Sequence, residues 1–390
     1  MPSQSTPLSL NWLNVIFLSA TPILGIAGAI WWSATGQFNI ATLVFSLVYL
    51  NLTGISITAG YHRLFSHRSY DAAKPVQWLF IALGSACFEG SVVDWSTDHR
   101  VHHRYQDREE DPYAIHKGFW FAHIGWLFAK NWRADGSAVP DLWKSRVIRH
   151  QHQRYILWST FMGLVFPTLV CALWGDALGG LMIGGFLRVA INQQLTFLIN
   201  SLCHYAGSKP FSDKITARDN WFAALLTYGE GYHNFHHAFP GDYRNGIRWH
   251  DFDATKWLIY GLSKVGLAWR LHEVPPERIL QSKVLTQEKA LREKLSLQTV
   301  KSPVLLEQIH KTIDAAKEQL ALASERMTTI REQYESLKVQ YQSLKTSQNK
   351  AFARQVADLR AKFYEAQREL KRSYQRWNAM RNGYMKLASL

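Results

Sequence analysis

The sequence predicts an all-α integral membrane protein with four transmembrane helices, a helical cytosolic cap that carries a di-metal site, and a C-terminal coiled-coil or helical-hairpin extension. Three observations lead to this prediction. Long apolar runs without charged side chains fill much of the first half of the chain. Histidines recur at spacings that place several imidazoles on one face of a helix. The end of the chain shows heptad spacing of apolar residues.

The apolar runs predict the membrane helices. No Lys, Arg, Asp or Glu precedes Arg63. Because about 20 apolar residues cross the hydrocarbon core as a helix, four segments are long enough to span it. These segments are residues 12–32, 40–57, 156–174 and 178–202. The first has no basic leader in front of it, so we expect it to be retained as an anchor rather than cleaved.

The fourth span contains unusual polar residues. Arg188, Asn192, Gln193 and Gln194 are costly in hydrocarbon, so we expect them to face protein or a cavity. Hydrogen bonding between helices and contact with a substrate are equally good explanations. Arg188 and Gln193 are the candidates for substrate binding.

Charge asymmetry predicts the orientation in the membrane. The loop of residues 63–154 carries 13 Lys or Arg, whereas the turns at 33–38 and 175–177 carry none. The positive-inside rule then places both termini and every histidine cluster on the cytoplasmic side. Residues 76–93 are mostly apolar but include Glu89. If this segment crossed the bilayer, the histidines before it and the histidines after it would lie on opposite sides of the membrane. We therefore predict an interfacial or protein-covered helix at 76–93.

Two histidine clusters predict a metal site. Residues advance by about 100° along an α-helix, so histidines spaced i, i+3 and i+4 share one face. Neutral imidazole is a common metal ligand. One such cluster could equally be a histidine-rich surface turn, but a repeat makes coincidence a poor explanation. The repeats are His99, His102 and His103, and His233, His236 and His237.

Further histidines follow the second and fourth spans. His62 and His67 are five residues apart, about 140° around an α-helix, so they are badly placed to chelate one ion as a pair, but each could serve a different ion. His204 lies one turn after Asn200. Nine imidazoles on one side of the bilayer are too many for one ion and suit two. The candidate metal and catalytic residues are His62, His67, His99, His102, His103, His204, His233, His236 and His237, with Asn200 beside them.

The chain changes character after Pro275-Pro276. Apolar residues follow a 4-3 spacing from Ile309 to Leu344, slip by one residue near 346–350, and resume from Phe352 to Leu370. A skip in one coiled coil or a helical hairpin explains the slip, and the polar turn favours the hairpin. We therefore divide the chain into a membrane domain, residues 1–280, and a helical extension, residues 281–390.

Composition limits the remaining possibilities. The net charge of +14 is spread through loops and interleaved with acids, which favours an anionic membrane surface or substrate head group over nucleic acid. Cys87, Cys171 and Cys203 are odd in number and scattered, so no disulfide framework is expected. Residues 301–390 hold 17 basic and 9 acidic residues, which predicts self-association or docking of an electron-transfer partner.

The motifs, taken together, resemble those of the membrane fatty-acyl desaturase family, and within it the acyl-CoA Δ9 (stearoyl-CoA type) desaturases. The resemblance covers roughly residues 50–274, and three histidine boxes in this order make it specific. The matching segments are GYHRLFSH, DHRVHH with DPY and GFWFAHIGW downstream, NSLCHYAG, and GEGYHNFHHAFPGDYR followed by RWHDFDATKW.

The resemblance implies an oxidoreductase that uses O₂ and two electrons to insert a cis double bond, at Δ9, into a long-chain acyl-CoA. Side chains alone cannot oxidise an unactivated methylene, so such chemistry needs a metal cofactor. The resemblance implies a di-iron centre with the nine histidines as ligands and Asn200 holding a water on one metal. Imidazole ligation itself does not exclude zinc or copper, so iron rests on the resemblance.

The same resemblance implies the partners. These are the lipid bilayer, an acyl-CoA or acyl-lipid substrate, and a separate electron donor such as a ferredoxin, a flavoprotein reductase or a b-type cytochrome. We recognise no haem-binding cytochrome domain at either end of the sequence. The residues after Gln281 have no counterpart in the family core, so their role is not implied by it.

Three alternatives remain open. A histidine-box hydroxylase of fatty acids or alkanes shares the metal chemistry but returns an alcohol, and product analysis separates the two. A desaturase acting on glycerolipid-linked chains differs only in its acyl carrier. A membrane anchor for a coiled-coil scaffold, with histidines that merely buffer metal, would lose its role when residues 301–390 are deleted, whereas an enzyme would retain activity.

Overall fold

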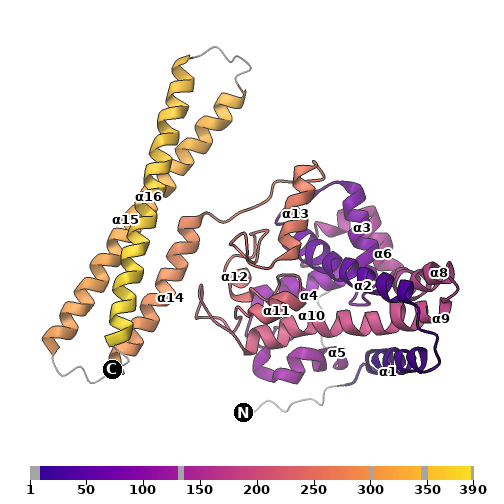
Figure 1. Cartoon of the computed structure of the whole chain (residues 1–390). Coiled ribbons are helices and arrows are strands. Elements are labelled where there is room, and N and C mark those ends of the chain that lie inside the picture. The colour runs from indigo at the N-terminus through magenta and orange to yellow at the C-terminus, as the bar shows by residue number, and fades with distance from the viewer. Residues whose placement is uncertain (1–8, 131–135, 298–302, 344–349, 388–390) are drawn as a thin grey trace. The chain divides into compact units, whose positions relative to one another are not determined.

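The computed structural model describes residues 9–130, 136–297, 303–343 and 350–387. The chain forms two compact units. The first, here called the membrane unit, comprises Met1–Lys209 and Asp213–Glu273, and the second, the C-terminal unit, comprises Pro210–Ser212 and Val274–Leu390. Figure 1 labels most of their α-helices.

Four helical stretches of the membrane unit are long and apolar enough to cross a membrane, by length and composition, as predicted. They contain α1 (Trp12–Ala34), α2 (Ile40–Ile55) continued by η1 (Ser56–Ser66), α7 (Tyr155–Thr160) with η5 (Phe161–Val165) and α8 (Phe166–Ala172), and α9 (Ala177–Gly179) with η6 (Gly180–Leu187) and α10 (Arg188–Tyr205). The second and fourth stretches are the longest, and each ends among the histidines.

Glycines allow these helices to approach closely. A Cβ on Gly25 of α1 would lie 2.6 Å from the Cα of Leu187, and one on Gly28 would lie 2.6 Å from the Cβ of Met182. Such small residues at crossings replace side-chain bulk with backbone contact, which is how helices associate in lipid. The contact holds α1 against η6.

The remaining elements of the membrane unit form a helical cap. A minimal antiparallel sheet pairs Asp71 with Trp269. α3 has only 12 residues, too few to cross a bilayer, in agreement with the prediction for residues 76–93. The cap elements are β1 (Asp71–Ala72), α3 (Lys74–Ser85), α4 (Val92–Tyr105), η2 (Ile115–Lys117), η3 (Phe121–Gly125), α5 (Trp126–Phe128), η4 (Leu142–Lys144), α6 (Arg146–Gln153), α11 (Trp221–Leu226), α12 (His233–Ala238), α13 (Ala254–Lys264) and β2 (Ala268–Trp269).

The C-terminal unit consists of α14 (Pro276–Ser296), α15 (Pro303–Ser343) and α16 (Lys350–Leu387). Arg326 pairs with Glu369 at 2.7 Å, and the rings of Tyr334 and Phe363 stack at 5.6 Å. Since positions later in α15 meet positions earlier in α16, the two helices are antiparallel, which confirms the hairpin form of the predicted extension (Figure 1). Most of the predicted slip lies outside the described residues. The heptad pattern did not predict α14 as a third packed helix.

Among the residues that the structure describes, Trp377 has the largest fully buried side chain. It packs in a cluster with Val284, Leu291 and Leu320, and its indole N–H donates to Gln287 at 2.9 Å. Replacement of Trp377 by alanine is expected to destabilise the C-terminal unit by about 3–5 kcal/mol because it leaves a large cavity. Hydrogen exchange of α14–α16 peptides in the full chain measures this loss.

The matched control for Trp377 is Tyr364, which lies on the same helix and is 47% exposed. Its replacement by alanine should cost less than about 1 kcal/mol. Equal exchange rates in the two variants would contradict the assigned core.

Candidate metal centre

Nine buried or half-buried histidines from four places in the fold form two clusters. They come from η1 and the residue that follows it, from α4, from α10 and from α12. In each cluster, one ligand atom per residue lies within 4.8 Å of every other. Cluster A contains His62, His67, His99, His103 and His236, and cluster B contains His102, His204, His233 and His237.

The two short histidine helices contribute to both clusters. On α4, His102 belongs to cluster B, while the neighbouring His99 and His103 belong to cluster A. On α12, His236 belongs to cluster A, whereas His233 and His237 belong to cluster B. The predicted shared helical faces are present. Each face, however, supplies both clusters rather than one.

The expectation that His62 and His67 are badly placed to bind one ion as a pair is wrong, since both belong to cluster A. The reason is local: residues 56–66 form a π-helix, in which hydrogen bonds join residues five apart. The amide of His67 accordingly donates to the carbonyl of His62 at 3.0 Å. Positions five apart therefore lie on nearly the same side, which α-helical geometry did not allow.

Distances between imidazole nitrogens fit metal ligation. In cluster A, Nε2 of His236 lies 3.0 Å from Nε2 of His62 and 3.0 Å from Nε2 of His103. In cluster B, Nε2 of His233 has two such neighbours, at 3.0 and 3.1 Å. Two nitrogens about 2.1 Å from one ion and about 90° apart lie about 3 Å from each other. The nine rings are thus spaced to bind two ions.

The electrostatic environment keeps the rings available for a metal. Burial, followed by the nearby imidazoles, lowers the pKa of His99, His103, His233 and His236 well below the usual histidine value. A ring that is neutral at physiological pH keeps one nitrogen lone pair free for coordination. Protonated rings at these separations would repel one another.

Each cluster has one histidine whose outer nitrogen contacts a buried carboxylate. Nδ1 of His62 lies 2.8 Å from Glu230, and Nδ1 of His102 lies 2.8 Å from Asp111. Such contacts fix the tautomer and the ring orientation, and they leave Nε2 as the ligand atom. Neither carboxylate was assigned a role from sequence, although Glu230 lies in GEGY and Asp111 in DPY.

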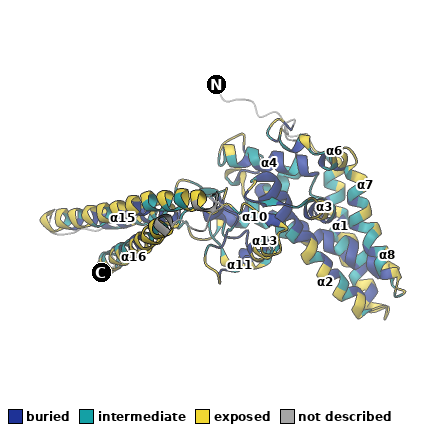
Figure 2. Ribbon diagram, turned by 90° about the horizontal axis from the view of Figure 1, so that it is seen from above, coloured by how far each residue is buried: buried dark blue, intermediate teal, exposed yellow. Residues whose placement is uncertain are grey.

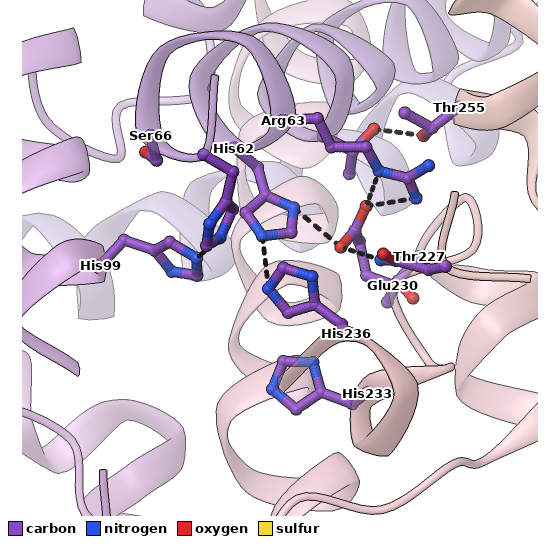
Figure 3. A network of polar contacts seen from close by, with 12 residues as sticks. His62, Arg63, Ser66, His99, Thr227, Glu230, His233, His236 and Thr255 are labelled. Carbon is purple, nitrogen blue, oxygen red and sulfur yellow. Dashed lines mark hydrogen bonds and ion pairs between the residues drawn. The ribbon is translucent and has the colours of Figure 1, made fainter. Parts of the chain in front are cut away.

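Glu230 is the centre of a buried polar network (Figure 3). Its carboxylate accepts from Arg63 at 2.8 Å and from Asn245 at 2.7 Å in addition to contacting His62. Burial alone would raise the pKa of Glu230, but the adjacent His62 and Arg63 lower it to about 2. Arg63 also pairs with Asp253 at 3.0 Å. The network joins η1 to the segment that precedes α12 and so holds His62 in place.

A cavity of about 430 Å³ adjoins the clusters. Four of the nine histidines and Asn200 lie on its wall, and apolar side chains such as Phe17 and Phe197 line other parts of it. Glu89 also lines the cavity, and its carboxyl group accepts from Trp95 at 3.3 Å and from Thr196 at 2.9 Å. Burial raises the pKa of Glu89 to about 8. The histidines on the wall are His62, His99, His102 and His233.

Arg188 and Gln193 are not among the residues that line this cavity. The Arg188 guanidinium donates to the carbonyls of Gly163 at 2.9 Å and Ala86 at 3.1 Å, and the Gln193 amide donates to the carbonyl of Cys87 at 3.2 Å. These hydrogen bonds join the fourth span to other segments of the membrane unit. They agree with the explanation from sequence that its polar side chains hydrogen-bond to neighbouring protein segments. Substrate binding by either residue stays a prediction.

Residues 38–270 match the model of a known protein family, described as fatty acid desaturase. The match spans more than half of the chain and contains both clusters. The chain belongs to the fatty acid desaturase family.

Individual members of the desaturase family agree with this assignment. The chain is 44% identical to the probable acyl-CoA desaturase of Schizosaccharomyces pombe over 72% of its own length and 59% of that protein. It is 44% identical to acyl-CoA desaturase 1 of Saccharomyces cerevisiae, over 73% and 56% of the two lengths. It is 36% identical to stearoyl-CoA desaturase 5 of Bos taurus, over 66% and 78%. The match thus covers little more than half of each yeast relative.

Proposed function

We propose that this protein is a membrane-bound acyl-CoA desaturase that inserts a cis double bond, at Δ9, into a long acyl chain. The observation that carries the proposal is the position of two histidine clusters against one largely apolar cavity. The relatives named above are acyl-CoA and stearoyl-CoA desaturases, which favours CoA over a glycerolipid as the acyl carrier.

Nine histidines would hold two iron ions, which would supply the O₂ chemistry that side chains lack. Reduction of O₂ to two water molecules takes four electrons and four protons. Two electrons and two protons come from the two methylene groups that become the double bond, two electrons come from a separate donor, and two protons come from the solvent. Asn200, on the cavity wall one turn before His204, would hold a water. Cytoplasmic placement of both termini and of the clusters is part of the proposal, on the strength of the charged loop.

The residues of the cavity have distinct tasks in this proposal. His62, His99, His102 and His233 bring metal ligands to its wall, so the reacting carbons would lie beside the clusters. Apolar residues hold the acyl chain and exclude water from the reaction. Glu89 joins α4 to α10 across the cavity through Trp95 and Thr196, which stabilises the shape that the chain must follow.

Expression in a host that cannot make unsaturated fatty acids tests the function. The expected result is growth without added unsaturated lipid and new cis double bonds at C9, mapped by mass spectrometry after derivatisation. His116 provides a control, because it lies outside both clusters, is exposed and pairs with Glu109. The His116→Ala variant should support the same growth. Hydroxylated chains without a new double bond would replace the proposal by the hydroxylase alternative.

A further inference from the structure

The three helices of the C-terminal unit differ sharply in charge. α14 has five basic and three acidic residues, and α15 has five basic and six acidic residues. α16 has ten basic residues against three acidic ones. Half of the net positive charge of +14 therefore lies on this one helix, and Figure 2 shows many exposed residues along it.

All five basic residues of α15, and Arg292 of α14, pair with acidic side chains within the unit. Arg292 contacts Glu288 at 3.0 Å, and Arg331 contacts Glu277 at 2.9 Å. Further pairs join Lys311 to Glu307, Lys317 to Glu288 and Arg326 to Glu369. This pattern is typical of a surface that is solvated and balanced by its own acids.

A group on α16 departs from that pattern. The group consists of Arg368, Lys371, Arg372 and Arg376. These four residues lie within a stretch of nine positions, and all four are exposed. Within the described parts of the chain, none of these four side chains is recorded in an ion pair. Spacings of three and four residues place them on adjacent turns of one side of the helix, where like charges repel. We call these four residues the basic row.

The neighbours of the basic row indicate the kind of partner. The other exposed residues in 367–376 are Gln367 and Gln375, both polar. Helices that lie on a membrane surface place Trp, Phe or Leu beside their cations, and this stretch exposes none of those. Arginine predominates over lysine, and its planar fork matches carboxylates in paired hydrogen bonds. The chemistry fits an acidic protein surface better than a lipid surface.

We propose that the basic row is a docking surface for an acidic electron-carrier protein. This inference rests on the proposed function, which consumes two electrons per double bond from a separate donor. A charged docking surface raises the association rate and the local concentration of its partner without changing the chemical step. Loss of the row should therefore raise the KM for the donor and leave kcat unchanged.

The test uses the full chain in nanodiscs of neutral lipid, with an acidic [2Fe–2S] ferredoxin as the probe. The Arg368→Glu/Arg372→Glu variant should show a KM for ferredoxin about 10-fold higher at low salt, and the difference should disappear at high salt. The matched control is Lys311→Glu/Lys338→Glu on α15, which changes the net charge equally but alters residues that already pair with acids. The control should leave KM within about twofold of the parent.

Ferredoxin binding is also measured without turnover, by fluorescence anisotropy, so that the inference is decided even if desaturation fails. Weaker binding by the row variant than by the control supports the docking surface. Equal binding by the two variants overturns it. Normal ferredoxin binding with lost affinity for vesicles of anionic phosphatidylglycerol also overturns it, because the row would then contact membrane rather than protein.

Discussion

Replacement of His102 by alanine is expected to abolish the proposed desaturation and to remove about one of the two iron ions proposed for each chain. His102 belongs to cluster B, is buried, lines the cavity, and has its Nε2 3.3 Å from that of His237. Loss of a ligand should lower metal affinity by more than the roughly 10–100-fold seen when only an outer partner of a ligand is lost. Activity and iron content, measured together, check both parts of the expectation.

A histidine outside the clusters controls for lost imidazole in general. His123 is buried and hydrogen-bonds to Ser201 at 2.9 Å and Gln194 at 3.0 Å, but belongs to neither cluster. The His123→Gln variant should keep two iron ions per chain. Full iron content in the His102→Ala variant would falsify the ligand assignment, whatever its activity.

Replacement of Glu230 by glutamine is expected to weaken iron binding about 10–100-fold and to destabilise the membrane unit. The contacts with His62 and Arg63 hold the pKa of Glu230 well below its usual value, so the carboxylate is charged at neutral pH. Three donors, from His62, Arg63 and Asn245, contact the Glu230 carboxylate. The side-chain amide of glutamine has only one oxygen that can accept from them. Loss of one carboxylate partner of the buried Arg63 should lower the free energy of unfolding by about 3 kcal/mol. The loss is not larger because Asp253 remains paired with Arg63.

Iron retention during dialysis against a chelator measures the first effect, and thermal unfolding in detergent measures the second. The control is Glu277→Gln, because Glu277 is as buried as Glu230 and pairs with Arg331 at 2.9 Å in the C-terminal unit. That variant should lose stability but keep its iron. Equal iron retention in the two variants would remove Glu230 from the proposed metal centre.

Agreement between sequence and structure is best where the signal is local. Four apolar segments predicted the four long helices to within a few residues at most boundaries, because hydrocarbon thickness requires a run of set length. Histidine spacing predicted the helical form of α4 and α12, because side chains three and four residues apart share a face. Heptad spacing predicted the long helices α15 and α16 for the same reason, and the polar stretch between them favoured the hairpin over one continuous coiled coil.

Agreement fails where the backbone departs from a standard α-helix and where a contact joins distant parts of the chain. A sequence pattern assumes a standard helix, so the π-helical turn that brings His62 and His67 together was missed. Carboxylates are common, so nothing local distinguished Glu230 and Asp111 from surface acids until they were found buried against histidines.

Taken by itself, the sequence determined which histidines gather in the fold and that they lie beside long apolar helices, since periodicity and hydropathy are properties of neighbouring residues. Only the tertiary structure decided how nine histidines divide into two clusters, which carboxylates orient them, and which residues line the cavity. Those facts depend on packing between segments far apart in the chain, and such packing leaves no periodic trace in the order of the amino acids.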